Sequence, residues 1–247
     1  MNPIVLIPAR LAATRLPAKP LADIAGTPMI VRVMRQAMAA NVGPVVVAAG
    51  DPEIVAAVEK AQGRAVLTDA SLPSGSDRIH SALERLDPGR RHDVAVNLQG
   101  DLPALDPRHI QIAVRALDKS GADIATLAAP IMDESERDNP SVVKTVVAWD
   151  RAGELGRALY FTRSTAPWGD GPLFHHVGLY AFRRAALAKF VSLAPSTLER
   201  REKLEQLRAL EANMSIAVAR VDSVPLSVDT EADLAKARKF FESRLPR

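Results

Sequence analysis

The first half of the chain alternates short, continuously apolar runs with longer amphipathic stretches. The apolar runs are rich in β-branched residues, too short for helices and followed by turn residues, which predicts buried strands. They cover residues 4–7, 45–48, 65–67 and 94–98. Repeated strand–helix units of this kind predict a Rossmann-like α/β fold with a mostly parallel central sheet and helices on both faces. In such folds ligands bind at the carboxyl ends of the strands.

Helix starts are marked by side chains that cap free backbone N–H groups, in three places just before a proline. These pairs are Thr27-Pro28, Asp51-Pro52 and Asp106-Pro107. Ser76 is a further candidate cap after the third strand, and Thr230 with Asp233 resembles a capping box. The caps place helices between the strands and a last helix at the end of the chain.

The second half of the chain is less regular. Strands are predicted at about 142–148, 159–162, 177–182 and 216–221, and one long helix at 197–212, where leucines recur near helical spacing. Internal repeats, low-complexity stretches and linkers are absent from the sequence. We therefore expect one domain over residues 1–247.

Composition narrows the class of protein. With 247 residues, 47% hydrophobic and 25% charged, the chain is an ordinary globular one. It contains no cysteine, which excludes disulfides and thiolate metal sites. Neither a signal peptide nor a run of about 20 apolar residues is present, so a cytoplasmic protein without membrane insertion is expected. A net charge of +3 with 4% aromatic residues argues against nucleic-acid binding.

Three cations, Arg10, Arg15 and Lys19, lie in the loop that leaves the first strand. In α/β folds this is where phosphate binds, yet neither G-x-G-x-x-G nor the P-loop signature is present, which counts against a dehydrogenase and an ordinary kinase. The three side chains could hold a triphosphate through charge-assisted hydrogen bonds. Their spacing alone is equally typical of a solvated basic surface.

Two carboxylates are candidate metal ligands. Asp101 follows the fourth strand directly after Gly100, and Asp229 precedes the last helix. Magnesium typically takes one or two carboxylates and leaves its other positions to phosphates and water. Asp229 by itself also fits a simple turn or cap, and the sequence does not show that it lies near Asp101.

The segment from Ser74 to Arg78 is a small-residue loop between the third strand and its helix. It could lie against a base and ribose with Arg78 as anchor, or serve only as a helix cap. His175 and His176 have no partner at metal-ligand spacing, so a zinc site is not expected. Nucleophilic hydrolase chemistry has no support either, because G-x-S-x-G is absent.

Read together, these motifs resemble the CMP-Kdo synthetases, the 3-deoxy-manno-octulosonate (Kdo) cytidylyltransferases of lipopolysaccharide synthesis. The likeness extends in order over essentially the whole chain. The motifs that carry it are the opening loop from Pro8 to Leu21, Asn97-Leu98-Gln99-Gly100-Asp101, Asn139-Pro140, Val142-Val143-Lys144, Ala158-Leu159-Tyr160-Phe161-Thr162-Arg163, Pro167-Trp168, His176-Val177-Gly178-Leu179-Tyr180, Leu204-Glu205-Gln206-Leu207-Arg208 and Ser227-Val228-Asp229-Thr230.

The resemblance implies a magnesium-dependent nucleotidyltransferase that uses CTP and Kdo as substrates and forms a homodimer. It also implies a nucleotidyltransferase fold with a smaller sugar-binding and dimerisation sub-region at about 130–215. The residues implied for CTP are Pro8, Ala9, Arg10, Arg15, Lys19, Ser74, Gly75, Arg78 and Gly100. Asp101 and Asp229 are implied as magnesium ligands. The residues implied for the sugar acid are Gln99, Arg163, His176, Tyr180, Glu205 and Gln206. The cations Arg10, Arg15 and Lys19 and the two acids would be the catalytic set.

Two alternatives stay open at this point. The chain could activate another sugar acid with CTP, such as sialic acid or 8-amino-Kdo. It could also be a nucleotide-binding module without catalysis, although such a module has no need of both carboxylates.

Overall fold

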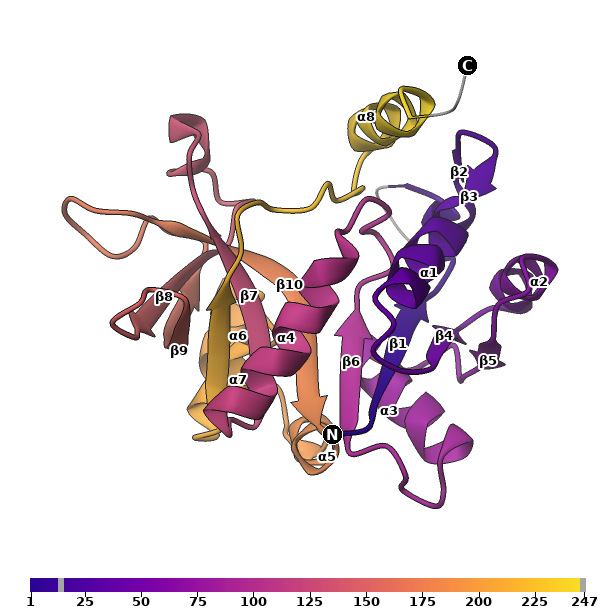
Figure 1. Cartoon of the computed structure of the whole chain (residues 1–247), viewed down its shortest axis with the longest axis horizontal. Coiled ribbons are helices and arrows are strands. Elements are labelled where there is room, and N and C mark those ends of the chain that lie inside the picture. The colour runs from indigo at the N-terminus through magenta and orange to yellow at the C-terminus, as the bar shows by residue number, and fades with distance from the viewer. Residues whose placement is uncertain (13–15, 245–247) are drawn as a thin grey trace. The chain divides into compact units, whose positions relative to one another are not determined.

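The computed structural model, drawn in Figure 1, describes residues 1–12 and 16–244. The chain divides into two compact units. The N-terminal unit comprises Asn2–Ile110 and Pro225–Arg247. The middle unit comprises Gln111–Val224 together with Met1.

The N-terminal unit is built on four parallel strands, made by the β-branched runs of the first half of the chain. Its elements are β1 (Pro3–Ala9), the 3₁₀ turn η1 (Lys19–Leu21), β2 (Asp23–Ile24), β3 (Thr27–Pro28), α1 (Met29–Ala39), β4 (Val45–Ala49), α2 (Pro52–Lys60), β5 (Ala65–Leu67), α3 (Gly75–Leu86), β6 (Val94–Leu98), the start of α4 (Pro107–Ser120) and α8 (Glu231–Glu242). β1, β4 and β6 are almost wholly buried, as expected for parallel strands covered on both faces.

The strand order β5-β4-β1-β6 locates the ligand-binding edge of this unit. Val5 of β1 pairs with Val45 of β4 on one side and with Val96 of β6 on the other. The chain moves outward from β1 through β4 to β5 and then returns to β6. Because such connections are right-handed, α1 and α2 cover one face of the sheet and α3 the other. The direction of winding changes between β1 and β6, so their carboxyl ends are the expected binding position.

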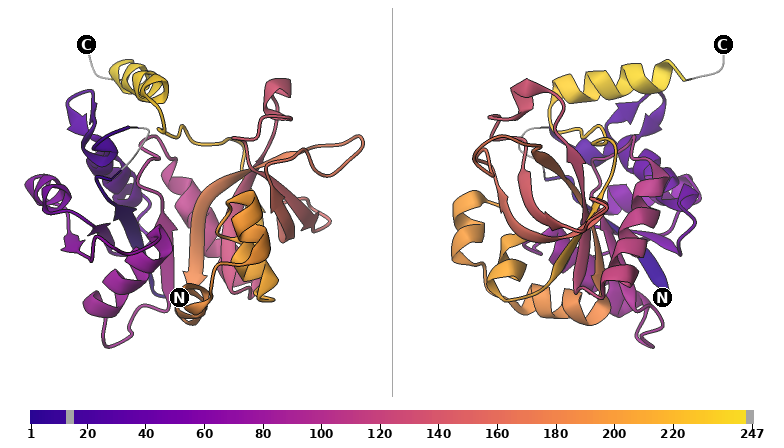
Figure 2. Two further views of the ribbon diagram at one scale, coloured as in Figure 1. Left: turned by 180° about the vertical axis from the view of Figure 1, so that it is seen from behind. Right: turned by 60° about the vertical axis from the view of Figure 1, so that its left-hand side comes forward.

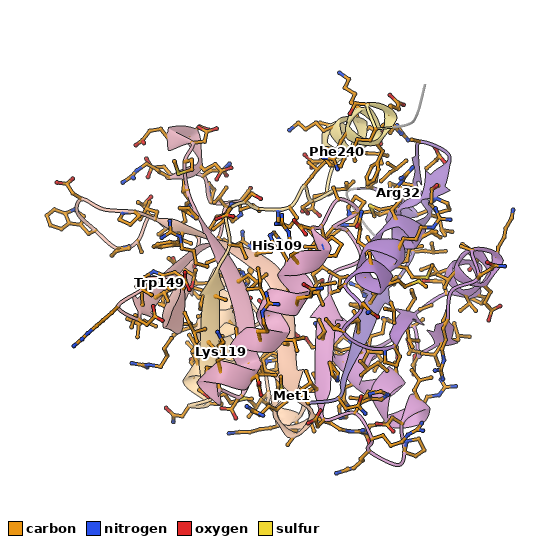
Figure 3. The ribbon with its side chains drawn as sticks, in the orientation of Figure 1. Met1, Arg32, His109, Lys119, Trp149 and Phe240 are labelled. Carbon is orange, nitrogen blue, oxygen red and sulfur yellow. The ribbon has the colours of Figure 1, made fainter. Side chains whose placement is uncertain are left out.

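The C-terminal helix α8 returns to this unit and packs against the start of the chain. Val228, Leu234 and Ala237 form one buried cluster with Leu16, Ile24 and Met29. The guanidinium of Arg32 on α1 also stacks on the ring of Phe241, 4.0 Å from its centroid. Figure 3 labels Arg32 and Phe240, the residue before Phe241. Apolar burial therefore fixes the segment just before α8.

The middle unit contains a mixed sheet of order β10-β7-β11-β9-β8. Its elements, after the rest of α4, are β7 (Ile124–Pro130), the 3₁₀ turn η2 (Glu134–Glu136), β8 (Lys144–Trp149), β9 (Leu155–Thr162), β10 (Phe174–Arg183), α5 (Arg184–Ser192), α6 (Thr197–Glu202), α7 (Leu207–Glu211) and β11 (Ile216–Arg220). β7 and β11 are parallel, and β7–β10, β9–β11 and β8–β9 are antiparallel. The helices α5, α6 and α7 lie on one face of these strands (Figure 2).

The α/β fold predicted from the sequence is confirmed, but four local predictions are wrong. The long helix at 197–212 is two short helices, α6 and α7, because Lys203 adopts a left-handed conformation (φ 56°) that ends the first. Thr27 does not cap α1; it lies in β3, and α1 begins after Pro28. Ser76 does not cap α3 either, since Ser74 occupies that position. The fourth is Asp51, whose side chain makes no capping bond at the start of α2.

Other predictions were confirmed by the hydrogen bonds. The capping box of Thr230 and Asp233 is present at the start of α8. Asp106 accepts the backbone N–H of Arg108 at 2.9 Å, as a cap of α4 should. Strand β7 was not predicted from the sequence, in which three alanines weaken the strand signal of Ile124 and Thr126. No helix in the described residues is long and apolar enough to cross a membrane.

Candidate active site

The loop after β1 is tied at its base to the end of β4. The backbone N–H of Gly50 donates to the carbonyl oxygen of Ala9 at 2.8 Å, and that of Leu11 donates to Oδ2 of Asp51 at 2.7 Å. Asp51 occupies the N-cap position of α2 before Pro52, as predicted, but its side chain makes no capping bond there, which corrects the predicted capping role. Its carboxylate instead holds the cationic loop where it leaves the sheet.

Two glycine-containing loops converge on Pro8. A Cβ on Gly100, after β6, would lie 3.0 Å from the carbonyl oxygen of Pro8. A Cβ on Gly75, at the start of α3, would lie 3.2 Å from Cγ of the same proline. Three segments that the sequence predicted for nucleotide binding therefore meet at the carboxyl ends of β1 and β6, with backbone approaches that leave little room for larger residues.

Arg10 and Arg78 lie near one another but are held very differently. Arg78 is 2% exposed, and its NH1 donates to Oγ1 of Thr68 at 2.6 Å and to the carbonyl of Asp69 at 3.0 Å. Burial first, and then the charge of Arg10, lowers the pKa of Arg78. Arg10 is exposed and makes no ion pair with any described residue, so it is available to an anion. Arg15 falls in 13–15, outside the described residues.

Ser74 shapes the start of α3. Its hydroxyl donates to Oδ2 of Asp77 at 2.6 Å and accepts the backbone N–H of Asp77 at 3.1 Å. The loop from Ser74 to Arg78 is therefore organised by its own hydrogen bonds, with Ser74 as helix cap and Arg78 anchored beneath the end of β5.

Lys19 lies between the two predicted metal ligands. Its Nζ is 2.8 Å from Oδ2 of Asp101 and 3.1 Å from Oδ1 of Asp229. These residues are far apart in the sequence, yet the structure brings their side chains to one ammonium group. The two aspartates thus form one anionic site, with a lysine as its present cation.

The position of Asp229 follows from its neighbours. The N–H of Val228 donates to the carbonyl of Asp101 at 3.0 Å, and the Val228 side chain is fully buried. Thr230, on the other side, caps α8. Asp229 is consequently held between a core residue and a helix cap, with its carboxylate directed to the site.

The electrostatics of Lys19 keep it charged. Burial, the largest influence, would lower its pKa, but the charges and hydrogen bonds of Asp101 and Asp229 together raise the pKa of Lys19 above its ordinary value. A pair of carboxylates that attracts a monovalent ammonium so strongly has the oxygen donors that a hard divalent cation requires.

The site offers a metal two side-chain ligands at most. In residues 1–12 and 16–244, no cluster of three or more His, Asp or Glu side chains could hold a metal ion. This donor set fits magnesium, which is bound through one or two carboxylates and completes its shell with water and phosphate oxygens. It does not fit zinc, whose sites use three or four protein ligands.

In the middle unit, Arg163 is immobilised by the chain around it. Its Nε donates to the carbonyl of Glu202 at 2.8 Å and its NH1 to the carbonyl of Pro140 at 2.9 Å. The Glu202 carboxylate accepts the backbone N–H of Arg163 at 2.9 Å and the hydroxyl of Thr162 at 2.8 Å. Lys144, fully buried, donates to the carbonyls of Asn139 and Arg163. The guanidinium is thus positioned before any ligand arrives.

His176 is a neutral donor. Its Nε2 lies 2.9 Å from Oγ1 of Thr126, which also lies 2.8 Å from the carbonyl of Leu179. Because a hydroxyl has one proton to donate, Thr126 donates it to a carbonyl and accepts from Nε2–H of His176. Burial, followed by the charge of His175, lowers the pKa of His176 to about 3.

The remaining residues predicted for the sugar lie in two places. Tyr180 contacts the His176 ring at 5.4 Å between centroids, and burial, with Glu205 second, raises its pKa, so the phenol stays protonated. Gln206 is buried at the start of α7 and Glu205 precedes it. Gln99 belongs to the N-terminal unit, where its Nε2 is 3.4 Å from Oδ1 of Asn97.

Several residues that shape the site were not predicted in these roles. Asp51 and Thr68 anchor the N-terminal loops, and Glu202 and Thr126 hold predicted site residues through hydrogen bonds across more than 30 residues of chain. Such long-range partners leave no local spacing signal. For Lys144, the sequence signal is its position in the family motif Val142-Val143-Lys144.

Comparison with known proteins places these features in a family. The family model described as "Cytidylyltransferase" matches residues 4–216. The chain is 65% identical to the 3-deoxy-manno-octulosonate cytidylyltransferase of Parvibaculum lavamentivorans, over 98% of this chain and 94% of that protein. It is 61% identical to the protein of the same name from Rhodospirillum centenum, over 98% and 95%.

A solved structure is also similar over the whole length. It is a CMP:2-keto-3-deoxy-manno-octonic acid synthetase complexed with CTP, 35% identical, with a TM-score of 0.90, covering 99% of this chain and 100% of that one.

Proposed function

The chain belongs to the cytidylyltransferase family, and from this premise we propose that it transfers CMP from CTP to 3-deoxy-D-manno-octulosonate, releasing pyrophosphate, for lipopolysaccharide synthesis. The observation that carries the proposal is the gathering of Asp101, Asp229 and Lys19 at the edge of the sheet from which the Arg10 loop emerges. A polyphosphate needs both the cations and a metal-binding acid pair, and this edge supplies both.

The reaction is a displacement at the α-phosphorus of CTP. The anomeric hydroxyl oxygen of Kdo forms the new P–O bond, the bond from the α-phosphorus to its bridging oxygen breaks, and the hydroxyl proton is lost. Phosphoryl-type transfers depend on positioning and charge stabilisation more than on covalent help from the protein. We assign the positioning of the triphosphate to Pro8, Ala9 and Gly100, and its neutralisation to Arg10, Arg15 and Lys19.

Asp101 and Asp229 would hold magnesium. When bound, the ion supplies neutralisation of phosphate charge and lowers the pKa of a coordinated hydroxyl. The two carboxylates contribute the anionic donors, and Val228 and Thr230 keep Asp229 directed at the site. Ser74, Gly75 and Arg78 would form the wall beside the cytidine.

Arg163 is our candidate for the carboxylate of the sugar acid. A guanidinium matches a carboxylate in a bidentate manner, and here it is fixed by Glu202 and Pro140 in advance. His176, Tyr180, Glu205 and Gln206 are our candidates for contacts to the sugar hydroxyls in the middle unit, and Gln99 is our candidate in the N-terminal unit. His176 and Tyr180 are uncharged at neutral pH, which suits hydrogen bonds to hydroxyl groups.

The decisive assay measures pyrophosphate release from CTP and Mg²⁺ with one candidate acid at a time: Kdo, sialic acid or 8-amino-Kdo. We expect turnover with Kdo to exceed turnover with the other acids, and none without an acid. Preference for sialic acid or 8-amino-Kdo would keep the reaction class and reject the substrate. CTP binding without pyrophosphate release from any acid would identify a non-catalytic module.

We propose in addition that the enzyme is a cytoplasmic homodimer, as its family resemblance implies. Light scattering coupled to size-exclusion chromatography measures the mass directly. A monomer mass near 26.6 kDa at working concentration would reject the dimer.

A further inference from the structure

Lys19 occupies the place between the two carboxylates that a divalent ion would need. Its Nζ is within hydrogen-bond distance of both Asp101 and Asp229, and its side chain is 17% exposed. One ammonium neutralises half of the charge of the two acids. A metal ion that binds oxygen at about 2.0–2.1 Å between the same two acids would lie against the ammonium, and the two positive charges would repel each other.

The backbone of Lys19 is not free to carry the side chain away. Its N–H donates to the carbonyl of Leu16 at 3.2 Å, Pro20 beside it is buried, and Leu21 and Ala22 continue the same turn. Removal of the ammonium therefore requires rotation of the side chain alone, away from both acids. Without a new acceptor, a charged and mostly buried amine would lose its two ion pairs, which is strongly unfavourable.

A polyphosphate removes that penalty. Arg10, in the same loop, is an exposed cation without an ion pair to a described residue, so it is available to hold phosphate oxygens at this edge of the sheet. Once they are present, Lys19 exchanges carboxylate oxygens for phosphate oxygens, and the acids become available to a divalent ion that the phosphates also help to bind.

We infer that Lys19 is an internal cation that blocks the acid pair against free divalent metal until a nucleotide triphosphate supplies it with replacement oxygens. The enzyme then takes up metal together with nucleotide and takes up free metal poorly. This inference rests on the proposed function for the identity of the nucleotide. Because coupling between two ligands is reciprocal, metal must tighten nucleotide binding by the same factor as nucleotide tightens metal binding.

Manganese binding tests the inference without any turnover. Electron paramagnetic resonance of free Mn²⁺ is recorded for the full-length protein in the absence of nucleotide, for the wild type, Lys19→Met and Lys19→Gln. Removal of the ammonium should tighten Mn²⁺ binding by roughly 5- to 150-fold, the usual range for coupled sites. Adding an α,β-methylene analogue of CTP should tighten binding to the wild type by a similar factor and to the variants much less.

Three controls make the result specific. Lys60→Met removes an exposed lysine from α2 and should leave Mn²⁺ affinity unchanged. Lys19→Arg keeps a cation and should keep free-metal binding weak. Asp101→Asn in the Lys19→Met background should abolish the gain, which assigns the bound ion to this pair. Circular dichroism at the titration temperature confirms that each variant is folded.

Equal Mn²⁺ affinity of the wild type, Lys19→Met and Lys19→Gln without nucleotide would overturn the inference. Failure of the proposed function has a different signature, namely no pyrophosphate from CTP with any acid. The metal titration without nucleotide is independent of that assay, so the two failures are distinguishable.

Discussion

The backbone N–H of Val228 donates a 3.0 Å hydrogen bond to the carbonyl oxygen of Asp101. This single bond joins the segment that follows β6 to the segment that precedes α8, each of which carries one carboxylate of the acid pair. Val228 is itself in the core beneath α8, so the packing of that helix sets the distance between the two acids. Stability of α8 and the geometry of the site are therefore linked.

Leu234→Ala should show this link. Leu234 is 2% exposed in the cluster with Val228, and truncation of a buried leucine removes about 2–5 kcal/mol of unfolding free energy. Pyrophosphate release should fall at temperatures where the protein is still folded, because Asp229 loses its support. Urea denaturation and the assay are compared with Lys239→Ala, an exposed change on the same helix, which should alter stability by less than about 0.5 kcal/mol. Normal pyrophosphate release by a destabilised Leu234→Ala variant would show that the geometry of the site does not depend on the packing of α8.

Arg10→Ala should reduce turnover with CTP by roughly 10³, in the range that a clamping arginine contributes in phosphoryl transfer. The reason is that Arg10 is exposed at the end of β1 and forms no ion pair within the described residues, so its loss removes a phosphate contact without breaking a structural one. Thermal unfolding should be unchanged. Arg64→Ala, an exposed arginine before β5, is the matched control and should be fully active. Normal kcat/KM for CTP in Arg10→Ala would show that Arg10 does not bind the triphosphate.

Gly100→Ala should lower activity by a steric route. The new Cβ would lie 3.0 Å from the carbonyl oxygen of Pro8, which must give way by a few tenths of an ångström. Displacement of the loop after β1 should raise KM for CTP and lower kcat together, since a small misplacement of the reacting phosphate greatly reduces the rate. Gly89→Ala, where no atom lies within 4 Å of the new Cβ, should behave as wild type. Steady-state kinetics at varied CTP distinguishes the two glycines.

The N-terminal half of the fold was readable because its signals are local. Strands at Ala65–Leu67 and Val94–Leu98 have the predicted ends, since the turn residues on either side of a β-branched run mark where the strand begins and ends. Parallel pairing then gathers the loops after these strands at one edge. The sequence therefore predicts that Arg10 and Asp101 lie at the same edge of the sheet.

The missing parts depend on long-range partners or on single backbone conformations. The sequence predicts that the side chain of Asp51 caps α2. In the folded chain, its carboxylate instead accepts the backbone N–H of Leu11, which is 40 residues away in the sequence. The leucines near 204 do face the core, but the left-handed conformation of Lys203 ends α6 before them. A lysine does not predict such a conformation, which is more often adopted by glycine or asparagine. That Lys19 would lie between Asp101 and Asp229 requires tertiary structure, because spacing cannot report proximity.

Glu202→Gln should weaken use of the sugar acid specifically. Its carboxylate accepts the backbone N–H of Arg163 and the hydroxyl of Thr162, and an amide can satisfy these bonds only in part. Loosening of Arg163 should raise KM for Kdo by roughly tenfold, about 1.4 kcal/mol, while KM for CTP stays constant. Glu154→Gln, an exposed acid just before β9, is the control. Equal changes in both KM values would indicate a general loss of structure rather than misplacement of Arg163.

The buried His176 should make the protein less stable as the pH falls. The folded state keeps its pKa at about 3 because burial penalises the imidazolium, whereas the unfolded chain has the ordinary value of 6.5. Between these values the unfolded state binds a proton that the folded state does not, so unfolding free energy falls on acidification, by up to about 1.4 kcal/mol per pH unit. Above the ordinary value the effect vanishes.

His176→Gln isolates this contribution, because the amide N–H can still donate to Oγ1 of Thr126 but does not titrate. Urea denaturation at about pH 7.5 and about pH 5 should show the wild type losing about 2 kcal/mol more than the variant over this interval. His175 and the carboxylates titrate in both proteins and cancel in the difference. Parallel losses in the two proteins would mean that the His176 ring accepts a proton within the fold, and the neutral imidazole assigned to the sugar pocket would then have to be replaced by a cation.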